Sequence, residues 1–67
     1  EYYFSRGVSH HFKGDYDRAI VDKTRAIELE SQNGLYYHSR SLSYLAKGNT
    51  TQAAADQKRA RELGYTA

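Results

Sequence analysis

Apolar and small side chains in the first dozen positions recur at three- and four-residue steps, which places them on one face of a helix. The set is Tyr3, Phe4, Gly7, Val8, His11 and Phe12. Gly14 is a natural C-terminal stop, because glycine readily adopts the left-handed conformation that closes a helix. Asp15 can then cap a second helix with its carboxylate.

The rest of the chain extends this plan to four helices. The second helix carries Tyr16, Ala19, Ile20, Ala26, Ile27 and Leu29, and it ends in the polar stretch 31–34, where Asn33 can cap the next helix. A third helix is predicted over 35–46, with a stop at Gly48 and a cap at Asn49 or Thr50. A fourth is predicted over 51–63, with Gly64 ending it. Without proline or an alternating strand pattern, the sequence predicts an all-α fold of two antiparallel helical hairpins.

The two hairpins are repeats of one another. A shift of 34 residues aligns these identical residues without a gap: Tyr2 with Tyr36, Tyr3 with Tyr37, Ser5 with Ser39, Arg6 with Arg40, Ser9 with Ser43, Lys13 with Lys47, Gly14 with Gly48, Ala19 with Ala53, Asp22 with Asp56, Arg25 with Arg59, Ala26 with Ala60, Glu28 with Glu62, and Leu29 with Leu63. We call residues 1–34 unit one and residues 35–67 unit two. A fixed period of this size is typical of a solenoid, in which each unit stacks on its neighbour.

Small residues recur where helices must approach closely. We expect Gly7 to face Ala19, and Ser41 to face Ala53, at the crossing within each hairpin. Ala26 and Ala60 lie seven residues further on, where each second helix would meet the following unit.

These features together resemble the tetratricopeptide repeat family, and the style is similar to bacterial members. The resemblance rests on the 34-residue period, Tyr3 and Tyr37, Gly7 and Ser41, the sequence KGDY before the second helix, and the four recurring alanines Ala19, Ala26, Ala53 and Ala60. It implies one domain over 1–67, stacked as a short right-handed α-solenoid whose first helices line a concave groove. Because the chain contains no Met, we also expect it to be a piece of a longer protein.

Several positions depart from the family pattern. Arg6 and Arg40 stand where leucine is favoured, but Asp22 and Asp56 follow each Arg at the same distance, so we predict a pair across each hairpin. The alternative is that all four are solvated. Lys23 and Gln57 replace aromatic residues. We expect this loss to weaken the core, although their aliphatic stems can lie along it.

The resemblance implies a protein- or peptide-binding groove on the first helix of each unit. By position, the groove residues are Phe4, Ser5, Val8, His11 and Phe12 in unit one, and Leu35, His38, Ser39, Leu42, Leu45 and Ala46 in unit two. Two alternatives stay open. These residues can simply pack within the hairpins or against other helices, or they can form a homo-oligomer by self-association of the same faces. The family's clamp for C-terminal carboxylates is not expected, because its positions hold Phe4, Val8 and Ser39, none of them cationic.

Other function classes find little support in the sequence. The formal charge is only +2, and the cluster Lys58, Arg59 and Arg61 is flanked by acidic residues, so we do not expect a nucleic-acid partner. His10, His11 and His38 lack further ligands at metal spacing, and there is no Cys. We therefore predict no metal, no cofactor, no membrane span and no catalytic site, while the compartment stays open with the cytoplasm slightly favoured.

Overall fold

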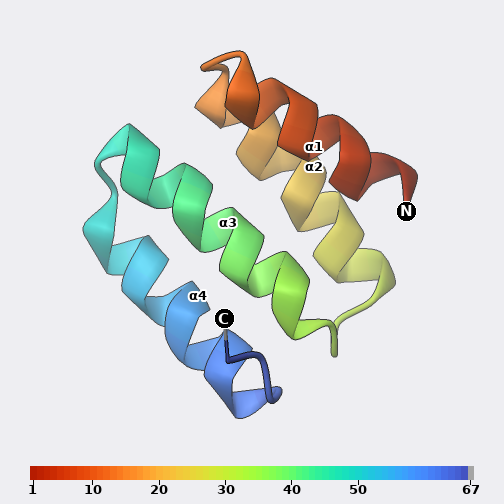
Figure 1. The fold of residues 1–67 in the computed structure, drawn as a ribbon, viewed down its shortest axis with the longest axis vertical. Helices are drawn as coiled ribbons and strands as arrows, with labels where there is room; N and C mark the ends of the chain where they lie inside the picture. The colour runs from red at the N-terminus through yellow and green to blue at the C-terminus, as the bar shows by residue number, and fades with distance from the viewer. Residues whose placement is uncertain (67) are drawn as a thin grey trace.

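The computed structural model describes residues 1–66 and contains four helices (Figure 1). They are α1 (Tyr2–Phe12), α2 (Tyr16–Leu29), α3 (Gly34–Lys47) and α4 (Thr50–Glu62). The predicted all-α class and the four helices are confirmed, and the predicted helix ends lie within one residue of those observed. Ala67, the last residue of unit two, lies outside the described residues.

Each helix begins at a polar side chain that accepts a hydrogen bond from a backbone amide three residues later. Asp15, Asn33 and Asn49 cap α2, α3 and α4, as the sequence predicts, and Glu1 caps α1. Both hairpin corners close in the same way. Gly14 and Gly48 have φ values of 82° and 91°, and the amide of the following residue donates to the carbonyl of His10 in one corner and of Tyr44 in the other.

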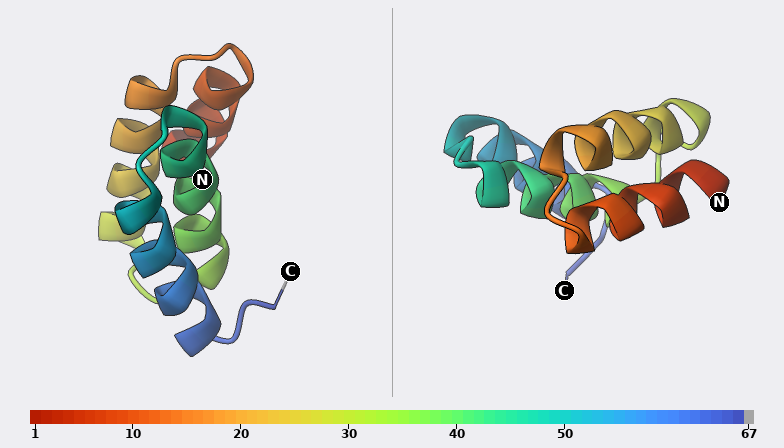
Figure 2. Two further views of the ribbon diagram at one scale, coloured as in Figure 1. Left: turned by 90° about the vertical axis from the view of Figure 1, so that its left-hand side faces the viewer. Right: turned by 90° about the horizontal axis from the view of Figure 1, so that it is seen from above.

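The helices form two layers, with α1 and α3 in one and α2 and α4 in the other (Figure 2). Within each hairpin the two helices run in opposite directions, and α1 runs parallel to α3 (Figure 1). The helix α3 packs against all three others, because it pairs with α4 and also contacts α2 and α1 of unit one. The α2–α3 contact therefore joins the two units.

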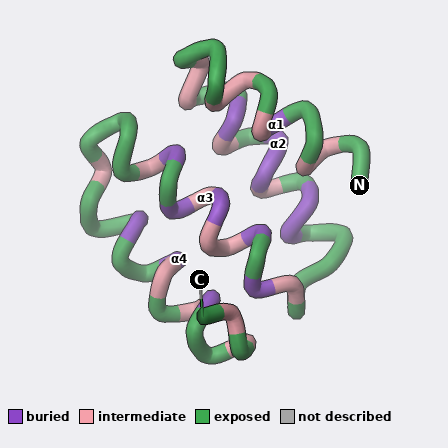
Figure 3. Tube along the Cα trace, viewed as in Figure 1, coloured by how far each residue is buried: buried purple, intermediate pink, exposed green. Residues whose placement is uncertain are grey.

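The core is built largely from small residues. Ala19, Ala26, Ala53 and Ala60 are buried, and the larger apolar side chains in the core are Ile27 and Tyr36 (Figure 3). Gly7 approaches α2 as expected, since a Cβ atom at this position would lie only 3.2 Å from the Ala19 carbonyl oxygen. Ser41 is fully buried like Ala53, and its hydroxyl donates to the His38 carbonyl at 2.5 Å.

An arginine–aspartate pair spans each hairpin, which confirms the pairing predicted from the spacing. Arg6 donates from Nε and Nη2 to the two carboxylate oxygens of Asp22, at 2.7 and 2.8 Å. Arg40 makes the same two bonds to Asp56, at 2.8 and 2.7 Å. The planar guanidinium matches a carboxylate in this two-bond geometry, so each pair fixes the register of its hairpin.

Candidate functional site

Three leucines on α3 leave a large part of their side chains in solvent. Leu35, Leu42 and Leu45 are 40%, 44% and 43% exposed. Phe12, at the end of α1, is 83% exposed. We call these four residues the apolar patch. Because α1 and α3 share a layer, the patch belongs to the layer that was predicted to line the groove.

Other predicted groove residues make contacts inside the molecule. The Phe4 ring stacks on Tyr36 with centroids 4.5 Å apart, and His38 lies against Tyr65 at 4.8 Å. His11 packs edge-on against Tyr16 at 5.1 Å. These side chains and Val8 are half-buried, so only part of each side chain is accessible to a partner. Ala46 and Ser5 are exposed.

Ser39 does not belong to an open surface, and here the sequence prediction is wrong. Its residue is only 7% exposed, and its carbonyl oxygen accepts a hydrogen bond from the Lys23 ammonium at 2.9 Å. Ser39 lies in the contact between α2 and α3, whereas Leu35, Leu42 and Leu45 stay exposed. Ser39 therefore joins the two units and is unavailable to a partner.

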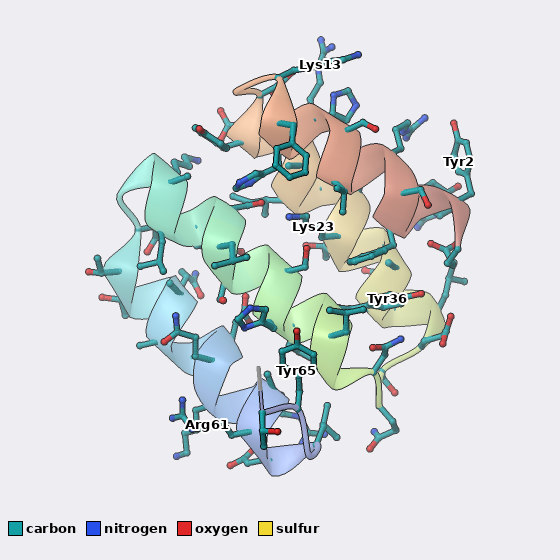
Figure 4. All side chains as sticks on the ribbon, in the orientation of Figure 1. Tyr2, Lys13, Lys23, Tyr36, Arg61 and Tyr65 are labelled. Carbon is teal, nitrogen blue, oxygen red and sulfur yellow. The ribbon has the colours of Figure 1, made fainter. Side chains whose placement is uncertain are left out.

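Lys23 is the least expected feature of the structure. The sequence predicted a stem along the core, but the whole side chain is buried, and Nζ also donates to Ser43 Oγ at 2.8 Å (Figure 4). Burial lowers the pKa of the Lys23 ammonium to about 8, because removal from water disfavours the charged form. One signal in the sequence pointed to its partners: Ser39 and Ser43 stand four residues apart, on one side of a helix.

A hydrogen-bonded chain runs from Lys23 through Ser43 to His11. Ser43 Oγ lies 2.9 Å from His11 Nδ1, so the hydroxyl that accepts from Lys23 can donate to the neutral ring. Burial, and then the charge of Lys23, lower the pKa of His11. Although an amine, a hydroxyl and an imidazole meet here, Ser43 is 0% exposed, and no substrate can reach its oxygen. This series of hydrogen bonds therefore links the two units structurally.

An open cleft of about 580 Å³ lies between the loop that joins the two units and the C-terminal residues of unit two. It is lined by the 30–34 loop, by Leu35 and by residues 63–65. Tyr65 reaches this position because Gly34 has no side chain: a Cβ atom there would lie 2.8 Å from Tyr65 Cβ. This contact was not predicted from the sequence. The cleft adds a concave surface beside Leu35.

Neither a metal-binding group nor a membrane-spanning helix is found within residues 1–66. No group of three or more His, Cys, Asp or Glu side chains lies close enough to hold a metal ion in this part of the chain. His10 Nε2 instead lies 3.7 Å from the Asp22 carboxylate, beside the Arg6 pair. None of the four described helices combines the length and the apolar character that a membrane crossing requires.

The repeated corners, caps and ion pairs define a helical-repeat protein. In comparisons with known proteins, residues 1–33 match the tetratricopeptide repeat family model, and this match supports a tetratricopeptide repeat in unit one. No curated protein matches the chain, and no solved structure does. Tetratricopeptide repeats generally mediate contacts between proteins, so protein binding is the activity class that the fold and the family match support.

Proposed function

We propose that the chain is a non-catalytic interaction module of two tetratricopeptide repeats, whose apolar patch binds a hydrophobic segment of another protein. Unit two is the second repeat in this proposal. It shares with unit one the asparagine- or aspartate-capped corner, the left-handed glycine and the arginine–aspartate pair.

The observation that carries the proposal is the exposure of Leu35, Leu42 and Leu45 along α3. Their spacing of seven and three residues puts them along one side of the helix, where an amphipathic helix or an extended apolar peptide can lie. Each Å² of apolar surface that a partner removes from water would contribute about 25 cal/mol to the free energy of binding. The partner segment is therefore expected to be apolar or aromatic.

Charge makes an acidic tail a poor candidate for this surface. The positions that would grip a terminal carboxylate hold Phe4, Val8 and Ser39, and the first two are packed while the third is buried. With no cation among them, the affinity must come from apolar contact.

A second candidate is self-association of the chain through the same patch. The exposure of Phe12 favours it, because a large aromatic side chain that is 83% exposed is suited to burial against a second apolar surface. Sedimentation over a range of concentrations separates the two functions. A stable monomer supports the adaptor, whereas a dimer that Leu42→Glu dissociates supports self-association.

The binding proposal is tested by selecting peptides from a displayed random library on the immobilised chain. Selected peptides should be rich in apolar and aromatic residues, and Leu42→Glu should abolish their binding by placing a charge in the patch. Val21→Glu is the matched control, because Val21 is also exposed but lies on α2 in the other layer. Equal loss of binding in both variants, or the absence of any selected peptide, would refute the proposal.

A further inference from the structure

Polar contacts join α2 to α3, beside the apolar cluster of Ala26, Ile27 and Tyr36. The ammonium of Lys23 is bonded to Ser39 and Ser43. Arg40 Nη1 donates to Thr24 Oγ1 at 3.2 Å, and Lys47 forms an ion pair with Asp17. Thus α2 contributes a carboxylate, an amine and a hydroxyl, and we call the residues that carry them the presenting residues. The residues of α3 that contact these groups are the receiving residues.

The receiving residues of α3 all recur on α1. A shift of 34 residues turns Ser39, Arg40, Ser43 and Lys47 into Ser5, Arg6, Ser9 and Lys13, each identical in type. Tyr36, which is buried at the edge of the α2–α3 contact, becomes Tyr2. We call Tyr2, Ser5, Arg6, Ser9 and Lys13 the outer face of α1.

Within residues 1–66, no unit packs over these residues of α1 as α2 packs over α3. Tyr2 is 63% exposed where Tyr36 is 6% exposed, and the Arg6 side chain is 46% exposed where that of Arg40 is 18% exposed. Arg6 Nη1 donates to the exposed Tyr2 hydroxyl, in place of the threonine that the equivalent atom of Arg40 contacts. Tyr2 and Lys13 project from the α1 edge of the molecule (Figure 4).

The presenting residues of α2 do not recur on α4. Asp17, Lys23 and Thr24 correspond to Thr51, Gln57 and Lys58, so the carboxylate and the amine are lost at their positions. The apolar Ile20 and Ile27 become Ala54 and Arg61. In addition, a lysine at position 58 would meet the arginine of any α1-type helix stacked on α4, and like charges repel.

We infer that the outer face of α1 docks a further helical hairpin, whose second helix presents a carboxylate, a lysine six residues later and a hydroxyl next to that lysine. This is the spacing of Asp17, Lys23 and Thr24, and the internal α2–α3 contact is its template. The face lies on α1, whereas the three leucines that carry the binding proposal lie on α3, so the inference goes beyond the proposed function. The inference also distinguishes the two ends of the molecule. The α1 end can dock a further hairpin, whereas α4 lacks the groups that would dock onto α1 of a second copy.

The test is a fusion in which a second copy of residues 1–34 directly precedes Glu1 of the full chain. This junction keeps the repeat period, so the added α2 meets α1 as α2 meets α3. Docking should raise the melting temperature by about 4 °C or more. It should also reduce hydroxyl-radical oxidation of Tyr2 in the original chain severalfold, toward the level of the buried Tyr36.

The matched control is the same fusion with Asp17→Thr, Lys23→Gln and Thr24→Lys in the added copy, which gives it the residues of α4. Tyr2 should stay reactive in this control, and Ser9→Ala in the receiving helix should reduce the gain of the first fusion. Leu42→Glu should leave Tyr2 protected, which separates this inference from the binding proposal. Equal oxidation of Tyr2 in the two fusions would overturn it, as would head-to-tail assembly of the unfused chain through α4.

Discussion

Among single residues, Lys23 makes two of the polar contacts that join the units. Its amine is withdrawn from water, yet two hydrogen-bond acceptors on α3 satisfy it. Buried polar groups with complete partners fix one arrangement of the surrounding helices, but a buried charge costs free energy. The balance shifts with pH, because the cost applies only to the protonated amine.

Stability should therefore rise with pH above neutrality. The pKa of Lys23 is about 8 in the fold, below its ordinary value of 10.5, so between these values the unfolded chain binds more protons. The free energy of unfolding should increase by roughly 2 kcal/mol from pH 7.5 to pH 10. Urea titrations measure it. Lys23→Met should lack this increase, and a parallel increase in the variant would contradict the assignment to Lys23.

His11 should give a pH dependence of the same sign as Lys23, but in the acid range. Because its pKa is lowered in the fold, the unfolded chain takes up the proton first, and stability is lost as pH falls through about 6.5. Protonation would also place a second positive charge near Lys23. His11→Gln can keep a hydrogen bond to Ser43 without titrating. Melting temperatures from pH 7.5 to 5.5 should fall more for the natural chain than for this variant, and equal slopes would count against the role of His11.

Gly7 should tolerate no larger side chain, although it lies in the middle of a helix. A Cβ atom there would lie 2.9 Å from Lys23 Cγ and 3.2 Å from the Ala19 oxygen. Gly7→Ala should destabilise the chain by about 1–3 kcal/mol through overpacking, despite the better helix propensity of alanine. Ser9→Ala, at an exposed site of the same helix, serves as control and should change stability by less than about 0.5 kcal/mol. A stabilised Gly7→Ala chain would disprove close packing at this site.

Among the helices, local chemistry could be predicted from the sequence and contacts between units could not. The caps and corners follow from residues within a few positions, such as Asp15 and Gly14, so they were predicted correctly. The arginine–aspartate pairs were also predicted, because both members repeat with one spacing. The burial of the Lys23 amine was not predicted, because its partners are a hydroxyl and a backbone carbonyl whose positions depend on the packing of α3 against α2.

The two ion pairs should differ in strength although their geometry is alike. Arg40 is less exposed than Arg6 and also bonds Thr24, so less water screens its attraction to Asp56. Double-mutant cycles with alanine should give Arg40 and Asp56 a coupling energy of about 1 kcal/mol or more. The coupling of Arg6 and Asp22 should be smaller. The reverse order would show that the contact between units does not strengthen the second pair.

Across the molecule as a whole, two surfaces have separate proposed roles. We propose that the apolar patch on the α1–α3 layer binds a hydrophobic segment and that the outer face of α1 receives another hairpin. Among the residues predicted to line the groove, the leucines of α3 are exposed, whereas Ser39 is buried between the units.

Peptide binding by the apolar patch can be mapped by an NMR titration of the isotope-labelled chain with a selected apolar peptide. Amide shifts should change along α3 around Leu35, Leu42 and Leu45, with little change on the exposed side of α2. Leu42→Glu should remove these shifts, while Val21→Glu should keep them. Peptide-induced shifts that map to α2 and α4, or that survive Leu42→Glu unchanged, would contradict binding at the patch.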